Sequence, residues 1–127
     1  MTFAYVSFTS GQAGSTLLNQ IENTLNAFNS EESKGAKIAT TDMKGNSARG
    51  LIISTKSDAP NPLTLGTTWN YKEFDTGSDY EAMYQEATDF LNNDSSLTET
   101  QKYYSQMTMT NAASNTARLV IWYRNQK

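Results

Sequence analysis

Three short runs of this chain are apolar at every position, and they constrain the fold more than any other feature. They cover residues 3–6, 51–53 and 119–123, and each is rich in aromatic or β-branched residues, which favour strands. A strand with one face in water alternates apolar and polar residues, and these runs do not alternate. We therefore expect a sheet that is covered on both faces, by helices on one side and by further protein on the other.

Two segments carry the spacing of amphipathic helices. In residues 16–29 one helical face collects Leu17, Leu18, Ile21, Leu25 and Phe28. The second segment begins at Ser78 and Glu81, whose spacing matches a capping box. Its apolar face collects Tyr80, Met83, Tyr84, Ala87, Phe90 and Leu91. Another capping box at Ser96 and Glu99 predicts a short helix that ends near Tyr104.

The remaining strands are predicted from composition and turn signals. Residues 2–9, 63–71 and 117–124 favour strands, and residues 36–43 and 48–55 favour a β-hairpin around the turn cluster at 44–47. The conformation of residues 105–116 stays open, and no internal repeat is evident. At 127 residues the chain has the length of one domain, so we expect residues 1–127 to form a single α+β domain in the order β-α-β-β-α-β.

Most of the chain resembles the dimeric α/β-barrel proteins, which are built from ferredoxin-like units. The resemblance rests on the segments AYVSF, LLNQIENTLNAF, AKIATTDMKGNSARGLIIST, TTWNYKEFDTGSDYEAMYQEA and RLVIWYR. It implies one antiparallel sheet with both main helices on one face, and a homodimer in which two sheets pack face to face. The haem-degrading and monooxygenase members often use a His, and this chain has none, so the resemblance implies no catalytic residue.

The chain contains no histidine and no cysteine, which excludes several classes of chemistry. Serine–histidine triads, thiolate nucleophiles and histidine- or thiolate-ligated metals need residues that are missing. An enzyme would depend on Asp, Glu, Lys or Tyr, so a cofactor-free oxygenase or isomerase is the chemistry left open. We expect no metal and no cofactor, and the catalytic residues stay unknown.

Charge and hydropathy also limit the partners and the location. The net charge is −3, and the ten Lys and Arg residues are scattered rather than clustered, which argues against nucleic-acid binding. No stretch approaches the roughly 20 apolar residues of a membrane-spanning helix. We therefore expect a soluble cytoplasmic protein, or one carried inside a virion.

Aromatic and cationic residues on predicted strands are the candidate site residues. Trp69, Tyr71 and Trp122 could form the wall of a cleft for a flat or apolar ligand, or could belong to the core or a dimer interface. Arg49 and Arg124, and also Arg118, could hold an anionic ligand or pair with a structural carboxylate.

Other polar groups are weaker candidates. The carboxylates of Asp42, Glu73 and Asp75 could act as acid and base if they meet in a cleft, and otherwise are solvated loop charges. Gly11 and Gly14 before the first helix could hold a phosphate, but they lack the Gly-Lys-Ser/Thr of a phosphate loop and fit a plain turn.

Two functions follow. The first is a homodimer that binds a small organic molecule in a cleft between sheet and helices. The alternative is a structural or assembly protein, for example of phage origin, whose apolar sheet face is a contact surface without catalytic activity. An enclosed apolar pocket lined by the aromatic residues would favour the first, and a filled interior would favour the second.

Overall fold

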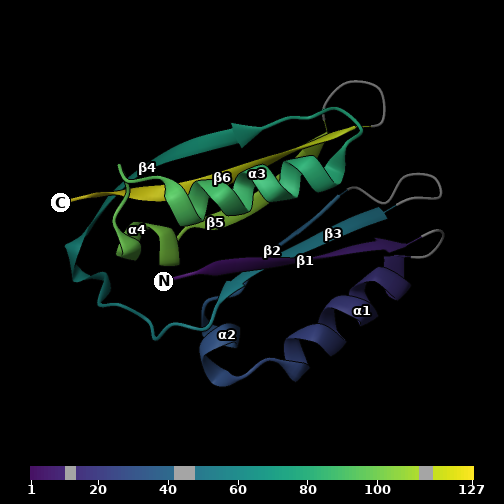
Figure 1. Cartoon of the computed structure of the whole chain (residues 1–127), viewed down its shortest axis with the longest axis horizontal. Helices are drawn as coiled ribbons and strands as arrows, with labels where there is room; N and C mark the ends of the chain where they lie inside the picture. The colour runs from purple at the N-terminus through teal and green to yellow at the C-terminus, as the bar shows by residue number, and fades with distance from the viewer. Residues whose placement is uncertain (11–13, 42–47, 112–115) are drawn as a thin grey trace.

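The computed structural model describes residues 1–10, 14–41, 48–111 and 116–127 (Figure 1). The first half contains β1 (Phe3–Ser10), α1 (Gly14–Ala27), α2 (Ser30–Lys34), β2 (Lys37–Thr40) and β3 (Ala48–Thr55). After a short 3-10 helix, η1 (Pro62–Thr64), the second half contains β4 (Leu65–Phe74), α3 (Tyr80–Asn93), α4 (Glu99–Tyr103), β5 (Gln106–Asn111) and β6 (Ala117–Gln126). The α+β class is confirmed.

The strands form two antiparallel sheets of three strands each. Sheet A has the order β1-β3-β2 and sheet B has the order β4-β6-β5. The expectation of a single sheet with both main helices on one face is therefore wrong for the described residues. The physical reason is β5, which lies in the segment that the sequence left open. It pairs with β6, so β6 completes a sheet with β4 and β5 rather than joining β1.

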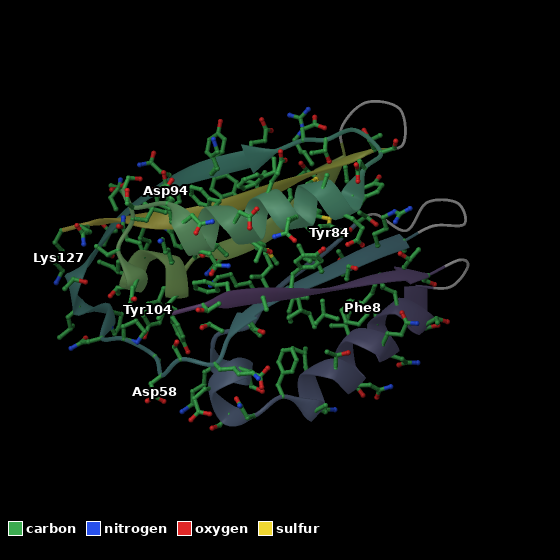
Figure 2. All side chains as sticks on the ribbon, in the orientation of Figure 1. Phe8, Asp58, Tyr84, Asp94, Tyr104 and Lys127 are labelled. Carbon is green, nitrogen blue, oxygen red and sulfur yellow. The ribbon has the colours of Figure 1, made fainter. Side chains whose placement is uncertain are left out.

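The helices and sheets are layered in the order α1, sheet A, α3, sheet B (Figure 1). On one face of sheet A, Leu17 and Ile21 of α1 pack against Ile52. The other face of sheet A and the inner face of sheet B enclose α3 in one core cluster. Figure 2 shows both contacts, with Phe8 directed toward α1 and Tyr84 lying between α3 and sheet A. The helix α3 is therefore buried on two sides, whereas α1 is buried on one.

The helix starts differ in detail from the predicted capping boxes. The N-cap of α3 is Asp79 rather than Ser78, and its carboxylate accepts a hydrogen bond from the backbone N–H of Ala82. The capping box of α4 uses Thr98 and Gln101 rather than Ser96 and Glu99. Each carboxylate or hydroxyl satisfies a backbone donor that a helix start leaves unpaired. The predicted positions of the two helices are confirmed to within a few residues.

The same β-α-β-β unit occurs twice along the chain. Both main helices have 14 residues, and both short helices that follow them have 5. The strand registers also correspond. The pair of Phe3 and Thr55 in sheet A occupies the same position as the pair of Trp69 and Arg124 in sheet B. The pair of Lys37 and Ile53 likewise occupies the same position as the pair of Gln106 and Trp122.

The sequence itself carries a weak trace of this repeat. Residues 2–11 (TFAYVSFTSG) align with residues 68–77 (TWNYKEFDTG), with a shared Thr, Tyr, Phe and Gly. Residues 46–52 (NSARGLI) align with residues 115–121 (NTARLVI), with a shared Asn, Ala, Arg and Ile. The expectation that the chain has no internal repeat is therefore wrong. The signal is confined to these two blocks, and their offsets differ because the second unit has three more residues between its helices.

Candidate functional site

The aromatic candidates lie together on one exposed sheet face. We define the outer face of sheet B by the side chains that alternate away from α3, namely Trp69, Tyr71, Glu73, Gln106, Thr108, Thr110, Arg118, Val120, Trp122 and Arg124. The opposite face carries Leu119 and Ile121, which pack against α3. Trp69 is 44% exposed, Tyr71 60% and Trp122 37%, so no described helix covers these side chains.

The aromatic side chains of this face contact one another across the strands. Tyr71 and Trp122 are direct neighbours, and their ring centroids are 5.2 Å apart. The indole N–H of Trp122 donates a hydrogen bond of 2.9 Å to the hydroxyl of Thr108. The guanidinium of Arg124 lies 6.0 Å from the ring of Trp69, within the range of a cation–π contact. Four of the five candidate residues are therefore close together.

The carboxylates at one end of this face pair with an arginine and not with each other. Arg118 donates to Glu73 at 2.8 Å and lies 3.8 Å from Asp75. The structural-pair hypothesis for Arg118 is therefore confirmed. An acid–base pair needs two carboxyl groups with different environments, and here both carboxylates share one cation. Asp42, the third candidate carboxylate, lies outside the described residues.

Arg49 is separated from the other candidates because it belongs to sheet A. Its guanidinium lies 4.2 Å from the centroid of the Tyr80 ring and 3.5 Å from the hydroxyl of Thr9. It therefore helps to hold the start of α3 against sheet A. The sequence could not predict that Arg49 and Arg124 lie in different sheets. Arg49 precedes one apolar strand run and Arg124 follows another, and the two runs have similar compositions.

A second polar cluster lies where α3 meets sheet A. Glu81 accepts hydrogen bonds from the hydroxyls of Tyr5, at 3.0 Å, and Ser7, at 2.8 Å. The hydrogen bond to Glu81 raises the pKa of Tyr5. Burial raises the pKa of Tyr84 to about 12. Both phenols therefore hold their protons at neutral pH, and neither is suited to act as a base.

Lys37 is a buried cation that the sequence did not single out. Its ammonium donates a 2.7 Å hydrogen bond to the backbone carbonyl of Tyr103, and it lies 5.4 Å from the ring of Phe3. Burial lowers the pKa of Lys37 to about 7. A lysine on a short strand has no sequence signal for burial. Its contacts tie sheet A to α4 and are not directed at a cleft.

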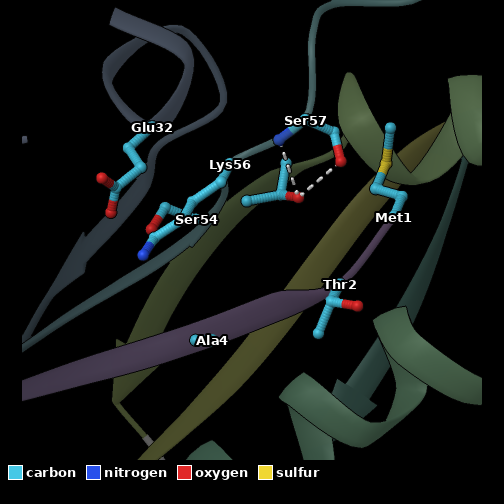
Figure 3. A pocket seen from close by; sticks show the side chains of 8 residues that line it. Met1, Thr2, Ala4, Glu32, Ser54, Lys56 and Ser57 are labelled. Carbon is cyan, nitrogen blue, oxygen red and sulfur yellow. Dashed lines mark hydrogen bonds between the residues drawn. The ribbon is translucent and has the colours of Figure 1, made fainter. Parts of the chain in front are cut away.

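The recess drawn in Figure 3 is lined by segments of the sequence other than those that carry the aromatic candidates. It has a volume of about 400 Å³ and is open to solvent. It is lined by Met1, Thr2, Ala4, Glu32, Ser54, Thr55, Lys56 and Ser57. Small and singly charged side chains in an open recess give little apolar contact to an organic ligand. None of the candidate residues takes part in it.

The space between the sheets and α3 is filled by side chains. Leu51, Ile53, Met83, Leu119 and Ile121 are all fully buried there.

Among the described residues, no group of three Asp or Glu side chains is placed to hold a metal ion, and no helix is long and apolar enough to cross a membrane. Comparisons with protein-family models, with characterised proteins and with solved structures found no match for this chain.

Proposed function

We propose that this protein is a structural or assembly protein without catalytic activity, and that it binds a second copy of itself through the outer face of sheet B. The observation that carries the proposal is the exposure of Trp69, Tyr71 and Trp122 side by side on one sheet face. Contiguous apolar patches of several hundred Å² are unusual on monomers, because leaving them in water is unfavourable. Association would remove them from water.

Two further observations favour assembly over catalysis. The space between the sheets and α3 is filled by apolar side chains of the described residues. The carboxylates of the two polar clusters also have partners within the chain, since Glu81 accepts from Tyr5 and Glu73 accepts from Arg118.

The chain contains two tryptophans, Trp69 and Trp122, and both lie on the outer face of sheet B. Tryptophan emission, excited where tyrosine does not absorb, therefore reports on this surface. On dilution through the association range, we expect the emission maximum to shift to longer wavelength while sedimentation shows a fall in mass. A Tyr71→Ser variant should be monomeric at concentrations where a Lys72→Ser control still associates, since Lys72 lies on the same strand but on the opposite face. A monomer at all concentrations would show that the proposal is wrong.

A small organic molecule on the same face is the second candidate. The tilted Tyr71 and Trp122 rings and the Arg124 guanidinium near Trp69 could stack on a flat or anionic ligand. Fluorescence titration of the monomeric protein with flat aromatic acids tests this candidate. Saturable quenching that Arg124→Gln weakens would support it, and linear quenching alone would count against it.

A further inference from the structure

We propose that the outer face of sheet B is covered by helix α1 of a second copy. This inference rests on the proposed self-association and names the surface that completes it. The repeated β-α-β-β unit supports this contact, because the equivalent face of sheet A is covered by helix α3 within the same chain.

The equivalent face of sheet A is the one that α3 covers. Phe3, Tyr5 and Ser7 of β1 correspond to Trp69, Tyr71 and Glu73 of β4. Leu51 and Ile53 of β3 correspond to Val120 and Trp122 of β6 in the same register. Leu51 and Ile53 are fully buried and Val120 is buried as well, whereas Trp122 is 37% exposed. The fold therefore has two equivalent faces, of which one is covered by a helix.

Besides the contact of Arg49 with Tyr80, three sets of contacts to strand β1 hold α3 on sheet A. The Tyr84 ring lies 6.0 Å from the Tyr5 ring. Glu81 accepts hydrogen bonds from Tyr5 and Ser7. Asn92 accepts a 2.7 Å hydrogen bond from the backbone N–H of Phe3 and donates a 3.0 Å hydrogen bond to its carbonyl. They place the start, the middle and the end of α3 along strand β1.

The helix α1 carries side chains at each of the three equivalent positions, and all are exposed. Leu18 corresponds to Tyr84 and is 53% exposed. Asn26 corresponds to Asn92 and is the same residue type. In the first pair the carboxylate of Glu81 lies on the helix and the hydroxyl of Ser7 lies on the strand. At the equivalent positions the helix carries the hydroxyl of Ser15 and the strand carries the carboxylate of Glu73, so the two groups have exchanged places.

The predicted contact follows residue by residue. Leu18 of one copy would pack on Tyr71 of the other, as Tyr84 packs on Tyr5. The hydroxyl of Ser15 would donate to Glu73, and Asn26 would bridge the backbone of Trp69 at the open edge of β4. The opposite face of α1 is already packed on sheet A, so the contact would bury α1 on both sides, as α3 is buried. The two surfaces differ, so the interface is heterologous.

Engineered thiols test this arrangement directly, because the chain has no cysteine of its own. The variants Ser15→Cys and Glu73→Cys, which keep Leu18 and the Tyr71 ring, are mixed at an associating concentration and treated with a short bis-maleimide. We expect a covalent dimer in this mixture, and none in a mixture of Asn23→Cys with Glu73→Cys. Asn23 is the matched control because it is an exposed position of the same helix, and its counterpart Asp89 is also exposed.

The other outcomes separate the two proposals. A covalent dimer formed by Glu73→Cys alone, without cross-linking to Ser15→Cys, would show that two sheets meet face to face; the self-association would then stand and the helix contact would be wrong. No cross-link in any mixture, together with a monomer of the unsubstituted chain by sedimentation, would overturn both. Because Ser15 and Glu73 are exposed, circular dichroism of each variant should match that of the unsubstituted chain.

Discussion

The side-chain amide of Asn92 bridges the backbone of Phe3, accepting from its N–H at 2.7 Å and donating to its carbonyl at 3.0 Å. The two residues are 89 positions apart and belong to different units of the repeat. The bridge satisfies two groups at the edge of β1 that pair with no other strand.

Replacing Asn92 with Asp should destabilise the fold, because the carboxylate keeps the acceptor and loses the donor to the Phe3 carbonyl. We expect a loss of about 1–3 kcal/mol in the free energy of unfolding, measured by urea denaturation. Asn93→Asp is the matched control, since it adds the same charge at the neighbouring exposed position of α3. Equal losses in both variants would show that the bridge adds nothing to stability.

Replacing Tyr84 with Phe should stabilise the protein. The hydroxyl oxygen of Tyr84 is buried without a hydrogen-bond partner among the described residues, and its ring contacts with Tyr5 and Tyr80 do not need it. Removing a desolvated, unpaired hydroxyl should raise the free energy of unfolding by about 1 kcal/mol. Tyr104→Phe provides the contrast, because the Tyr104 hydroxyl donates to the carbonyl of Pro60 and its removal should lower stability. A loss in both variants would contradict the prediction.

The buried ammonium of Lys37 should make stability rise with pH. Burial lowers the pKa of Lys37 to about 7 in the folded state, whereas the unfolded lysine keeps its ordinary value of 10.5. Between these values the unfolded state binds more protons, so the free energy of unfolding increases with pH, with a slope that approaches about 1.4 kcal/mol per pH unit. Below the folded pKa both states are protonated and this slope vanishes.

Denaturant titrations from about pH 6 to pH 9 measure the slope, below the range in which tyrosines ionise. In Lys37→Met we expect the dependence above pH 7 to disappear, whereas Lys34→Met, at an exposed position, should keep it. An unchanged profile in Lys37→Met would show that the ammonium is not the cause.

The hydrogen bond between Tyr5 and Glu81 should be visible in the titration of the tyrosine. The Glu81 carboxylate stabilises the protonated phenol and so raises the pKa of Tyr5. In Glu81→Gln the charge is removed, and the pKa of Tyr5 should fall toward its ordinary value, as followed by the ring resonances in NMR. Glu86→Gln, at an exposed position on the same helix, should leave it unchanged. The same pKa of Tyr5 in both variants would contradict the assigned cause.

Local pattern predicted most elements of this fold. The spacing of Leu17, Ile21 and Leu25 predicted α1, and the hairpin of β2 and β3 was predicted from two strand-like runs around a turn cluster. The segment that forms β5 stayed open between a strand and a helix end, because its sequence, QMTMTN, mixes polar residues with methionines and shows little β-branching beyond threonine. That one strand decides between one sheet and two, so an ambiguity in one local segment changed the predicted arrangement of the whole fold.

The candidate site was predicted in part. Trp69, Tyr71, Trp122 and Arg124 do lie together, because alternate residues of paired strands share a face. The sequence could not predict whether this face is covered or exposed, because side chains alternate with a period of two residues on covered and exposed sheets alike. Lys37 and Glu81 were missed for a related reason. Lys37 and Glu81 have hydrogen-bond partners 66 and 76 residues away along the chain, and no nearby residue signals these contacts.

The layer order gives this small fold two chemically different ends. At one end the exposed positions of α1 are mainly Ser, Asn, Gln and Glu, and at the other end sheet B presents two indoles and a phenol. The whole molecule is therefore amphiphilic along the stacking direction of its layers, much as a single helix can be across its width. At an air–water interface or on a hydrophobic resin, such a molecule should adsorb in one preferred orientation, with sheet B against the apolar phase and α1 facing water.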